Sequence, residues 1–180
     1  MLRSLTRHWW VLVLRGLVSI LFAGFAFLNP HAAFATLVLA LGLFLLVDGA
    51  TALYLGVRMR GKDADWWMVL LEGLLGVGLG ILTFANPDIT AAGVVLFVAL
   101  WCLVTGTFEI STAIRLRKEI DHEWLLGTAG AVSVALGLLM LFNPTAGALS
   151  ITLWIGIYAL IFGLLLLGLG LRVRRANVVD

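Results

Sequence analysis

The chain has 180 residues, of which 62% are hydrophobic and 12% are charged, and its mean hydropathy is +1.11. Soluble domains are about 45–50% apolar and about 25% charged, so this composition excludes an ordinary soluble domain and indicates an integral membrane protein. The net charge of +2, from 12 Lys and Arg against 10 Asp and Glu, suggests no nucleic-acid partner.

Six apolar runs are long enough to cross a bilayer, which takes about 20 residues of helix. The first, third and fifth runs end at Asn29-Pro30, Asn86-Pro87 and Asn143-Pro144, which predict tight turns because proline cannot continue the preceding helix. The other two breaks are longer and charged, from Arg58 to Asp65 and from Arg115 to Glu123. The predicted helices cover residues 10–28, 33–57, 67–84, 90–114, 124–142 and 148–171.

Basic residues mark one side of the predicted bundle. Eleven of the 12 Lys and Arg lie in the N-terminal segment, the charged breaks or the C-terminal tail, and the Asn-Pro turns carry none. Short basic loops stay in the cytoplasm during insertion. We therefore predict a multi-pass protein of the cytoplasmic (inner) membrane with both termini in the cytoplasm.

Sequence features recur at an interval of 57 residues. The three Asn-Pro turns follow this period, and so do Trp10, Trp67 and Trp124. The period predicts an all-α integral membrane protein of six transmembrane helices, built from three parallel helical-hairpin repeats within a single membrane domain of residues 1–180. A pseudo-threefold arrangement of the hairpins and a linear array both fit. The repeats cover about residues 8–64, 65–121 and 122–175.

The first apolar run also resembles a secretory signal, with a weak cleavage site at residues 33–35. Cleavage there would delete half of the first repeat. We therefore expect this run to be retained.

Small residues follow one face of each predicted helix. Lipid supplies no hydrophobic drive between helices, so helices associate through close backbone contact at such residues. We expect these stripes to hold the fold together. The equivalent glycines are Gly16, Gly73 and Gly130 in the odd-numbered helices and Gly49, Gly106 and Gly163 in the even-numbered ones.

Four ionisable residues, Arg15, Asp48, Glu72 and Glu109, interrupt the apolar runs and form a candidate intramembrane polar cluster. A charge near mid-bilayer costs roughly 2.5 to 3.5 kcal/mol on insertion scales, so each is expected to face protein or water. At ~1.5 Å per residue, Arg15 and Glu72 lie about 21 Å from the outer turns and Asp48 about 22 Å. Glu109 lies closer to the cytoplasm.

Several interpretations of this cluster stay open. Arg15 could pair with Asp48 in the first hairpin or with Glu72 of the next repeat, which leaves one or two carboxyls free to titrate. Such a pair could instead only fix helix register, and Arg15 and Glu109 could extend to the interface. A substrate site is a further option. Hydroxyls that could complete the cluster are those of Thr51, Thr105, Thr107, Ser111 and Thr112.

Motifs of enzyme chemistry are missing from the sequence. It contains no phosphate-binding glycine loop, no HExxH and no Cys-x-x-Cys, and its single cysteine is Cys102. The charged loops are too short to form a catalytic domain. We therefore expect no enzyme activity, no catalytic residue, no cofactor and no metal site. The expected partner is the lipid bilayer, and homo-oligomerisation stays open.

The motifs of the first repeat resemble a known family. Trp10 precedes Leu14-Arg15-Gly16, an Asn-Pro turn follows, and Val47-Asp48-Gly49 lies in the returning helix. The second repeat keeps the pattern as Leu71-Glu72-Gly73 and Val104-Thr105-Gly106. Over nearly the whole chain this pattern resembles the HdeD-like acid-resistance membrane proteins of bacteria. The resemblance implies a multi-pass protein linked to survival under acid stress and adds no catalytic residue.

We therefore expect a structural or regulatory membrane protein of the stress-response type. The alternative is a small proton-linked transporter or channel that uses the intramembrane polar cluster. Against this alternative, the outer half of every span lacks charge, whereas a polar route has to cross roughly 30 Å of hydrocarbon.

Overall fold

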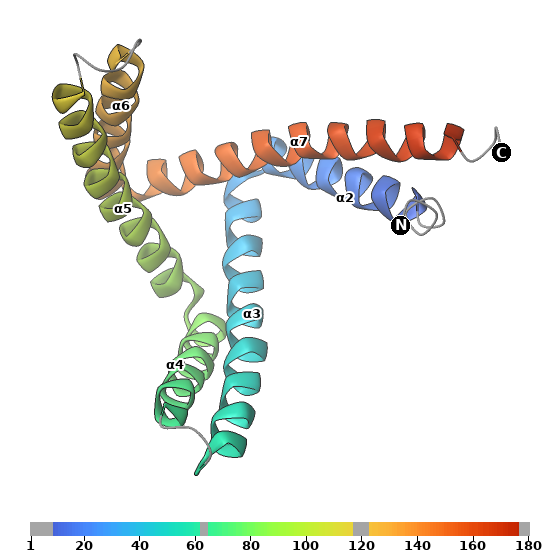
Figure 1. The fold of residues 1–180 in the computed structure, drawn as a ribbon, viewed down its shortest axis with the longest axis vertical. Helices are drawn as coiled ribbons and strands as arrows, with labels where there is room; N and C mark the ends of the chain where they lie inside the picture. The colour runs from blue at the N-terminus through green and yellow to red at the C-terminus, as the bar shows by residue number, and fades with distance from the viewer. Residues whose placement is uncertain (1–8, 62–64, 117–122, 177–180) are drawn as a thin grey trace. The chain divides into compact units, whose positions relative to one another are not determined.

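The computed structural model describes residues 9–61, 65–116 and 123–176, and every regular element in these ranges is an α-helix (Figure 1). The six helices agree in number and order with those predicted. All six are long and apolar enough to span a membrane. They are α2 (Trp9–Leu28), α3 (Pro30–Met59), α4 (Trp66–Ala85), α5 (Pro87–Arg115), α6 (Glu123–Phe142) and α7 (Pro144–Ala176).

A single asparagine joins the two helices of each repeat. The turns are shorter than predicted because the proline is the first residue of the following helix, where its missing N–H needs no partner. The Asn29 N–H donates to the Phe25 carbonyl at 2.9 Å, and the Asn29 carbonyl accepts the Ala33 N–H at 3.0 Å. The Asn143 Oδ1 also accepts the Ala146 N–H at 3.1 Å, which caps the start of α7. Each asparagine thus ends one helix and begins the next.

The two helices of a repeat differ in length. α2, α4 and α6 each have 20 residues, about 30 Å at ~1.5 Å per residue, which matches the hydrocarbon core of a bilayer. α3, α5 and α7 have 30, 29 and 33 residues and exceed that length. Near their C-terminal ends they carry Arg58, Arg115 and Arg172, which are equivalent positions of the three repeats. At such a helix end, an arginine reaches the polar headgroup layer.

The chain divides into two compact units. One contains Met1–Phe34 and Leu149–Asp180, and the other contains Ala35–Ala148. In the first unit α2 packs along α7, and in the second α3 packs along α4 and α5 packs along α6 (Figure 1). The single domain and the proposed repeat boundaries stay predictions.

The helices that pack closely come from different repeats. The sequence predicted hairpins made of the two helices of one repeat, joined at an Asn-Pro turn. In the structure, α4 packs along α3 and α6 packs along α5, the second helix of the preceding repeat in each case, and α2, the first helix, packs along α7, the last. Within the middle repeat, α4 meets α5 near their junction, where the hydroxyls of Thr83 and Thr90 lie 3.1 Å apart. In a linear series of repeats, α2 and α7 would have no partner. These two helices contact each other, so the order of pairing is cyclic.

Equivalent glycines form the contact in all three helix pairs. A Cβ atom added at Gly16 would lie 2.8 Å from the carbonyl oxygen of Gly163. Real Cβ atoms are essentially never found closer than 3.0 Å to such an atom, so a larger residue would push the helices apart. The predicted stripe of small residues is confirmed as the packing surface. The equivalent distances are 2.9 Å for Gly73 against Gly49 and 2.7 Å for Gly130 against Gly106.

The outward faces of the helix pairs are apolar. Leu21, Phe97 and Leu165 expose 65%, 65% and 66% of their surfaces. No more than 28% of any candidate span is buried against protein. An apolar surface of this extent is far larger than a soluble protein exposes, so it requires cover by lipid or by further protein.

We expect Gly73→Ala to destabilise the fold and Gly78→Ala to leave it intact. A Cβ at Gly73 would lie 2.6 Å from the Leu53 nitrogen, whereas one at Gly78, on the same helix, meets nothing within 4 Å. Overpacking of this kind costs about 1–3 kcal/mol, and the gain in helix propensity from alanine is the same at both positions. The measurement is the free energy of unfolding in bicelles. We call the contacts of the equivalent glycines in the three helix pairs the glycine seam. Equal stability of the two variants would contradict backbone packing at this seam.

Candidate functional site

The four residues of the intramembrane polar cluster are divided between the two compact units. Arg15 belongs to the unit that contains α2 and α7, and Asp48, Glu72 and Glu109 belong to the other. The predicted pairing of Arg15 with Asp48 or with Glu72 therefore stays a prediction.

Arg15 lies over an aromatic side chain of the helix that packs against its own. Its guanidinium carbon is 5.7 Å from the centre of the Phe162 ring of α7, within the range of a cation–π interaction. The Phe162 ring in turn stacks on Tyr158, with centroids 5.7 Å apart and an interplanar angle of 12°. The Arg15 charge is thus partly satisfied by the electron-rich face of a ring. Neither Phe162 nor Tyr158 was among the predicted site residues.

Asp48 and Glu72 line one groove between α3 and α4. The groove has a volume of about 460 Å³, and the rest of its lining is apolar or aromatic, including Trp67 and Leu75. Both carboxylates are exposed to it. Two like charges that share an apolar groove repel each other, which favours the approach of a cation.

The 57-residue period explains which side chains meet in each pair. Arg15 and Glu72 are equivalent positions, and so are Phe162 and Asp48. The same two positions are therefore filled by a cation and a ring in the α2–α7 pair and by two carboxylates in the α3–α4 pair. In the α5–α6 pair they are Ala129 and Thr105, which carry no charge. The period in the sequence could have identified Phe162, if the first helix had been paired with the last.

Glu109 lies in the third helix pair, apart from the other two carboxylates. A Cβ atom added at Gly130 of α6 would lie 2.9 Å from the Glu109 Cβ, so this residue stands at the α5–α6 contact. Its Oε2 atom is buried, and among the described residues it has no hydrogen-bond partner. A buried carboxylate oxygen without a hydrogen-bond partner costs free energy unless a polar group reaches it.

The threonine hydroxyls near the cluster bond to the backbone of their own helices. Each donates to a carbonyl three or four residues earlier, the usual bond of threonine in a membrane helix. Their hydrogens are therefore used in the helices and not in the predicted network with the carboxylates. The bonds are Thr51 to Asp48 at 2.7 Å, Thr105 to Trp101 at 2.8 Å, Thr107 to Leu103 at 2.6 Å and Thr112 to Phe108 at 2.7 Å.

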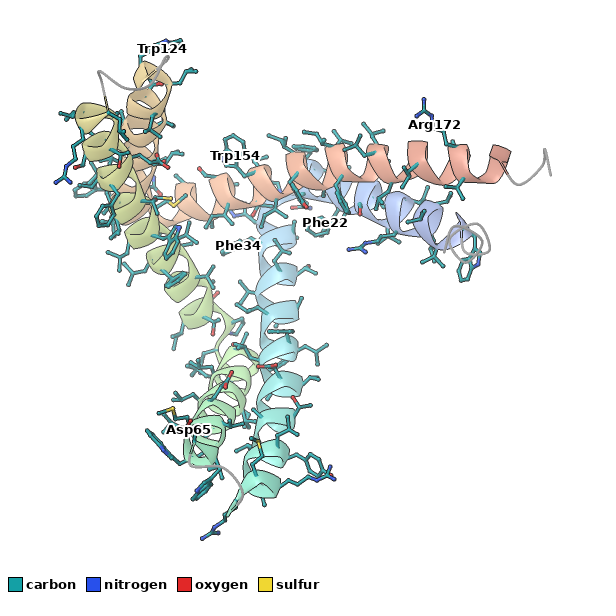
Figure 2. All side chains as sticks on the ribbon, in the orientation of Figure 1. Phe22, Phe34, Asp65, Trp124, Trp154 and Arg172 are labelled. Atoms are coloured by element: carbon teal, nitrogen blue, oxygen red, sulfur yellow. The ribbon has the colours of Figure 1, made fainter. Side chains whose placement is uncertain are left out.

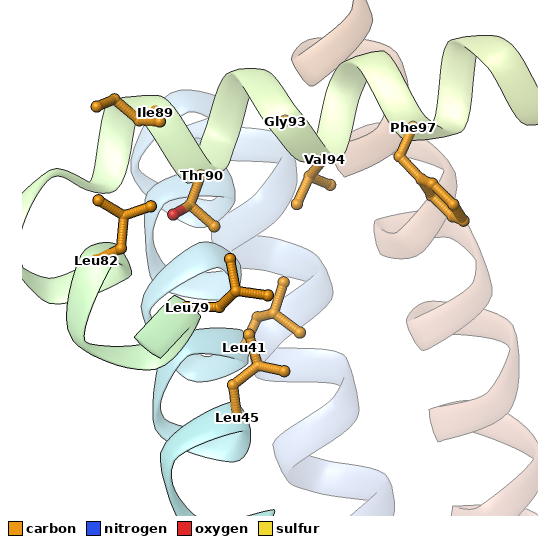
Figure 3. Close-up of a pocket in the computed structure, with 9 residues that line it drawn as sticks. All are labelled: Leu41, Leu45, Leu79, Leu82, Ile89, Thr90, Gly93, Val94 and Phe97. Carbon is orange, nitrogen blue, oxygen red and sulfur yellow. The ribbon is translucent and has the colours of Figure 1, made fainter. Parts of the chain in front are cut away.

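An apolar pocket adjoins the acidic groove. Its volume is about 500 Å³, and it shares Leu45 and Leu79 with the groove (Figure 3). The one hydroxyl in its lining belongs to Thr90, which is within hydrogen-bonding distance of the fully buried Thr83. Thr83 also donates to the Leu79 carbonyl at 2.8 Å. In this part of the chain, the other side chains that line the space between the two carboxylates and the Asn86 junction are apolar.

The described ranges contain no set of metal ligands. No group of three or more His, Cys, Asp and Glu that could hold a metal ion occurs in them. Cys102 is a free, partly buried cysteine of α5.

The chain matches the profile of one protein family, described as a short repeat of unknown function (DUF308), over residues 14–83, 71–142 and 128–179. These matches cover well over half of the chain, so the chain belongs to this family. Successive matches begin 57 residues apart, which confirms three repeats. We found no curated protein and no solved structure that matches the chain. The finer resemblance to HdeD-like proteins stays a prediction.

We expect dicyclohexylcarbodiimide, an apolar carboxyl reagent, to modify Asp48 and Glu72 several-fold faster than Glu109. The first two carboxylates line an open groove of apolar side chains, whereas one oxygen of Glu109 is buried at a helix contact. Peptide mass spectrometry of the protein in lipid vesicles measures the three rates. Asp48→Asn and Glu72→Gln serve as controls for site assignment. Faster labelling of Glu109 would show that the groove is closed to an apolar reagent.

Proposed function

We propose that this member of the short-repeat family is a multi-pass protein of the cytoplasmic membrane that acts as a structural or regulatory element under acid stress, without catalytic turnover. The observation that carries the structural part is the glycine seam, which recurs in three helix pairs with nearly equal distances. Close backbone contact of this kind holds the two helices of each pair together in a membrane. A site that moves a substrate would instead need a polar path through it.

The proposed orientation rests on the basic ends of the helices. α3, α5 and α7 each carry an arginine near their C-terminal ends, and the guanidinium carbon of Arg60, between α3 and α4, lies 5.3 Å from the centre of the Trp66 ring. Arginine and tryptophan together are typical of a helix end in the headgroup layer, and basic ends favour the cytoplasmic side. The acid-stress part rests on the resemblance of the Leu14-Arg15-Gly16 and Val47-Asp48-Gly49 motifs to HdeD-like proteins.

A survival assay tests this proposal. A strain that lacks the protein should survive acid challenge less well than its parent, and a plasmid copy should restore survival. If the role is structural, a double variant with Asp48→Asn and Glu72→Gln should also restore it, whereas Gly73→Leu should not, because leucine cannot fit against α3. Gly78→Leu is the matched control, since nothing lies within 4 Å of that position. Equal survival of parent and deletion strain would refute the stress role.

The second candidate is a small proton-linked transporter or channel. The shared groove of Asp48 and Glu72 favours it, because ionisable side chains within membrane spans are typical of ion and proton pathways. The adjoining apolar pocket counts against it, since its lining offers the carboxylates no polar continuation. This candidate therefore requires polar groups from elsewhere in the chain or from a second copy.

Proton flux into liposomes separates the two candidates. For a proton-linked protein, we expect flux that falls to the level of empty liposomes in Asp48→Asn and in Glu72→Gln. Glu109→Gln is the control for loss of a carboxyl, because Glu109 lies in another helix pair. If wild type and variants give the same flux as empty liposomes, the structural proposal stands and the second candidate fails.

A further inference from the structure

A groove of about 300 Å³ runs along α7 toward its basic end. It is lined by Leu164, Leu165, Gly168, Leu169 and Arg172, which all belong to this one helix. Gly168 and Arg172 are four residues apart, so they lie on the same helix face. Figure 2 shows the Arg172 side chain projecting from α7 on the side away from α2.

Gly168 has no side chain and so leaves a notch in this groove. The notch has no packing role in the described part of the chain. A Cβ atom added there would meet nothing within 4 Å, whereas one added at Gly163 of the same helix would lie 2.9 Å from the Gly16 carbonyl oxygen. The two other repeats carry larger residues at the position of Gly168, Tyr54 and Ser111. Helix packing thus accounts for Gly163 and leaves the open notch at Gly168 without an explanation.

The groove lies at the depth of a lipid headgroup and the start of its acyl chains. Arg172 follows Pro144 by 28 residues, which is about 42 Å of helix, close to the roughly 40–45 Å of a bilayer with its headgroups. Leu164 and Leu165 stand two turns deeper and expose 57% and 66% of their surfaces. One end of the groove therefore meets the headgroup layer and the other end meets hydrocarbon.

We propose that this groove binds one anionic phospholipid from the leaflet at the basic ends of the helices. The Arg172 guanidinium pairs with the lipid phosphate, for which its planar donors are suited. One acyl chain lies in the notch at Gly168 and covers Leu164 and Leu165. The charge of Arg172 selects an anionic headgroup over a zwitterionic one. This inference depends on insertion of α7 in a bilayer and not on a role in acid stress.

Native mass spectrometry of the full-length protein tests it, with phosphatidylglycerol and phosphatidylcholine of identical acyl chains as probes. Wild type should retain one phosphatidylglycerol more tightly than any phosphatidylcholine. Arg172→Gln should weaken this binding roughly fivefold, as expected for loss of one cation at a membrane surface. Gly168→Leu, which keeps all charges and fills the notch, should weaken it as well.

Arg115→Gln is the matched control. Arg115 occupies the equivalent position at the end of α5, and Ser111 stands there in place of the notch glycine. If Arg115→Gln weakens binding as much as Arg172→Gln, or if Gly168→Leu has no effect while its melting temperature is that of wild type, the attraction is a general property of the basic surface and the proposal is wrong. Should Gly168→Leu fail to fold, the comparison of the two arginine variants still decides, because both side chains are exposed.

Discussion

The fold depends on the direct approach of two helix backbones at glycine. In lipid, leucine gains nothing by leaving the membrane for a helix interface, so the stabilisation has to come from contacts that lipid cannot make. In each pair, a glycine brings the backbone of one helix to within van der Waals distance of a carbonyl on its partner helix. These glycines are Gly16, Gly73 and Gly130. The larger side chains can then remain on the outside of each helix pair, where they are exposed.

This constraint leaves free to vary the two residues that directly precede the contacting glycines in each helix pair. Where the contact is made by glycine, the neighbouring residues need only avoid a clash, and the three pairs fill the same positions with Arg15 and Phe162, with Glu72 and Asp48, or with uncharged residues. One scaffold thus carries three different electrostatic environments. If the protein has an activity beyond structure, we expect it in the α3–α4 groove, since the carboxylates there face open space.

The cyclic pairing of helices also has a mechanical consequence. Each Asn-Pro junction has a single residue, the asparagine, bonded into both flanking helices, so it joins one helix pair to another along the chain. A repeat taken alone therefore leaves its small-residue stripes without partners. The three repeats are needed together, because α3 and α5 find their partners in the next repeat and α7 finds its partner in the first.

The sequence by itself determined the six helices, their ends to within a few residues, the three repeats and the small residues that pack. These features are local or periodic, so composition, proline and the 57-residue interval encode them directly. Only the tertiary structure decided that the helices pair across repeat boundaries, that Arg15 lies over Phe162, and that Asp48 and Glu72 share one groove. The physical reason is that all six helices carry the same kind of stripe, so the pattern of small residues specifies a contact surface without specifying its partner.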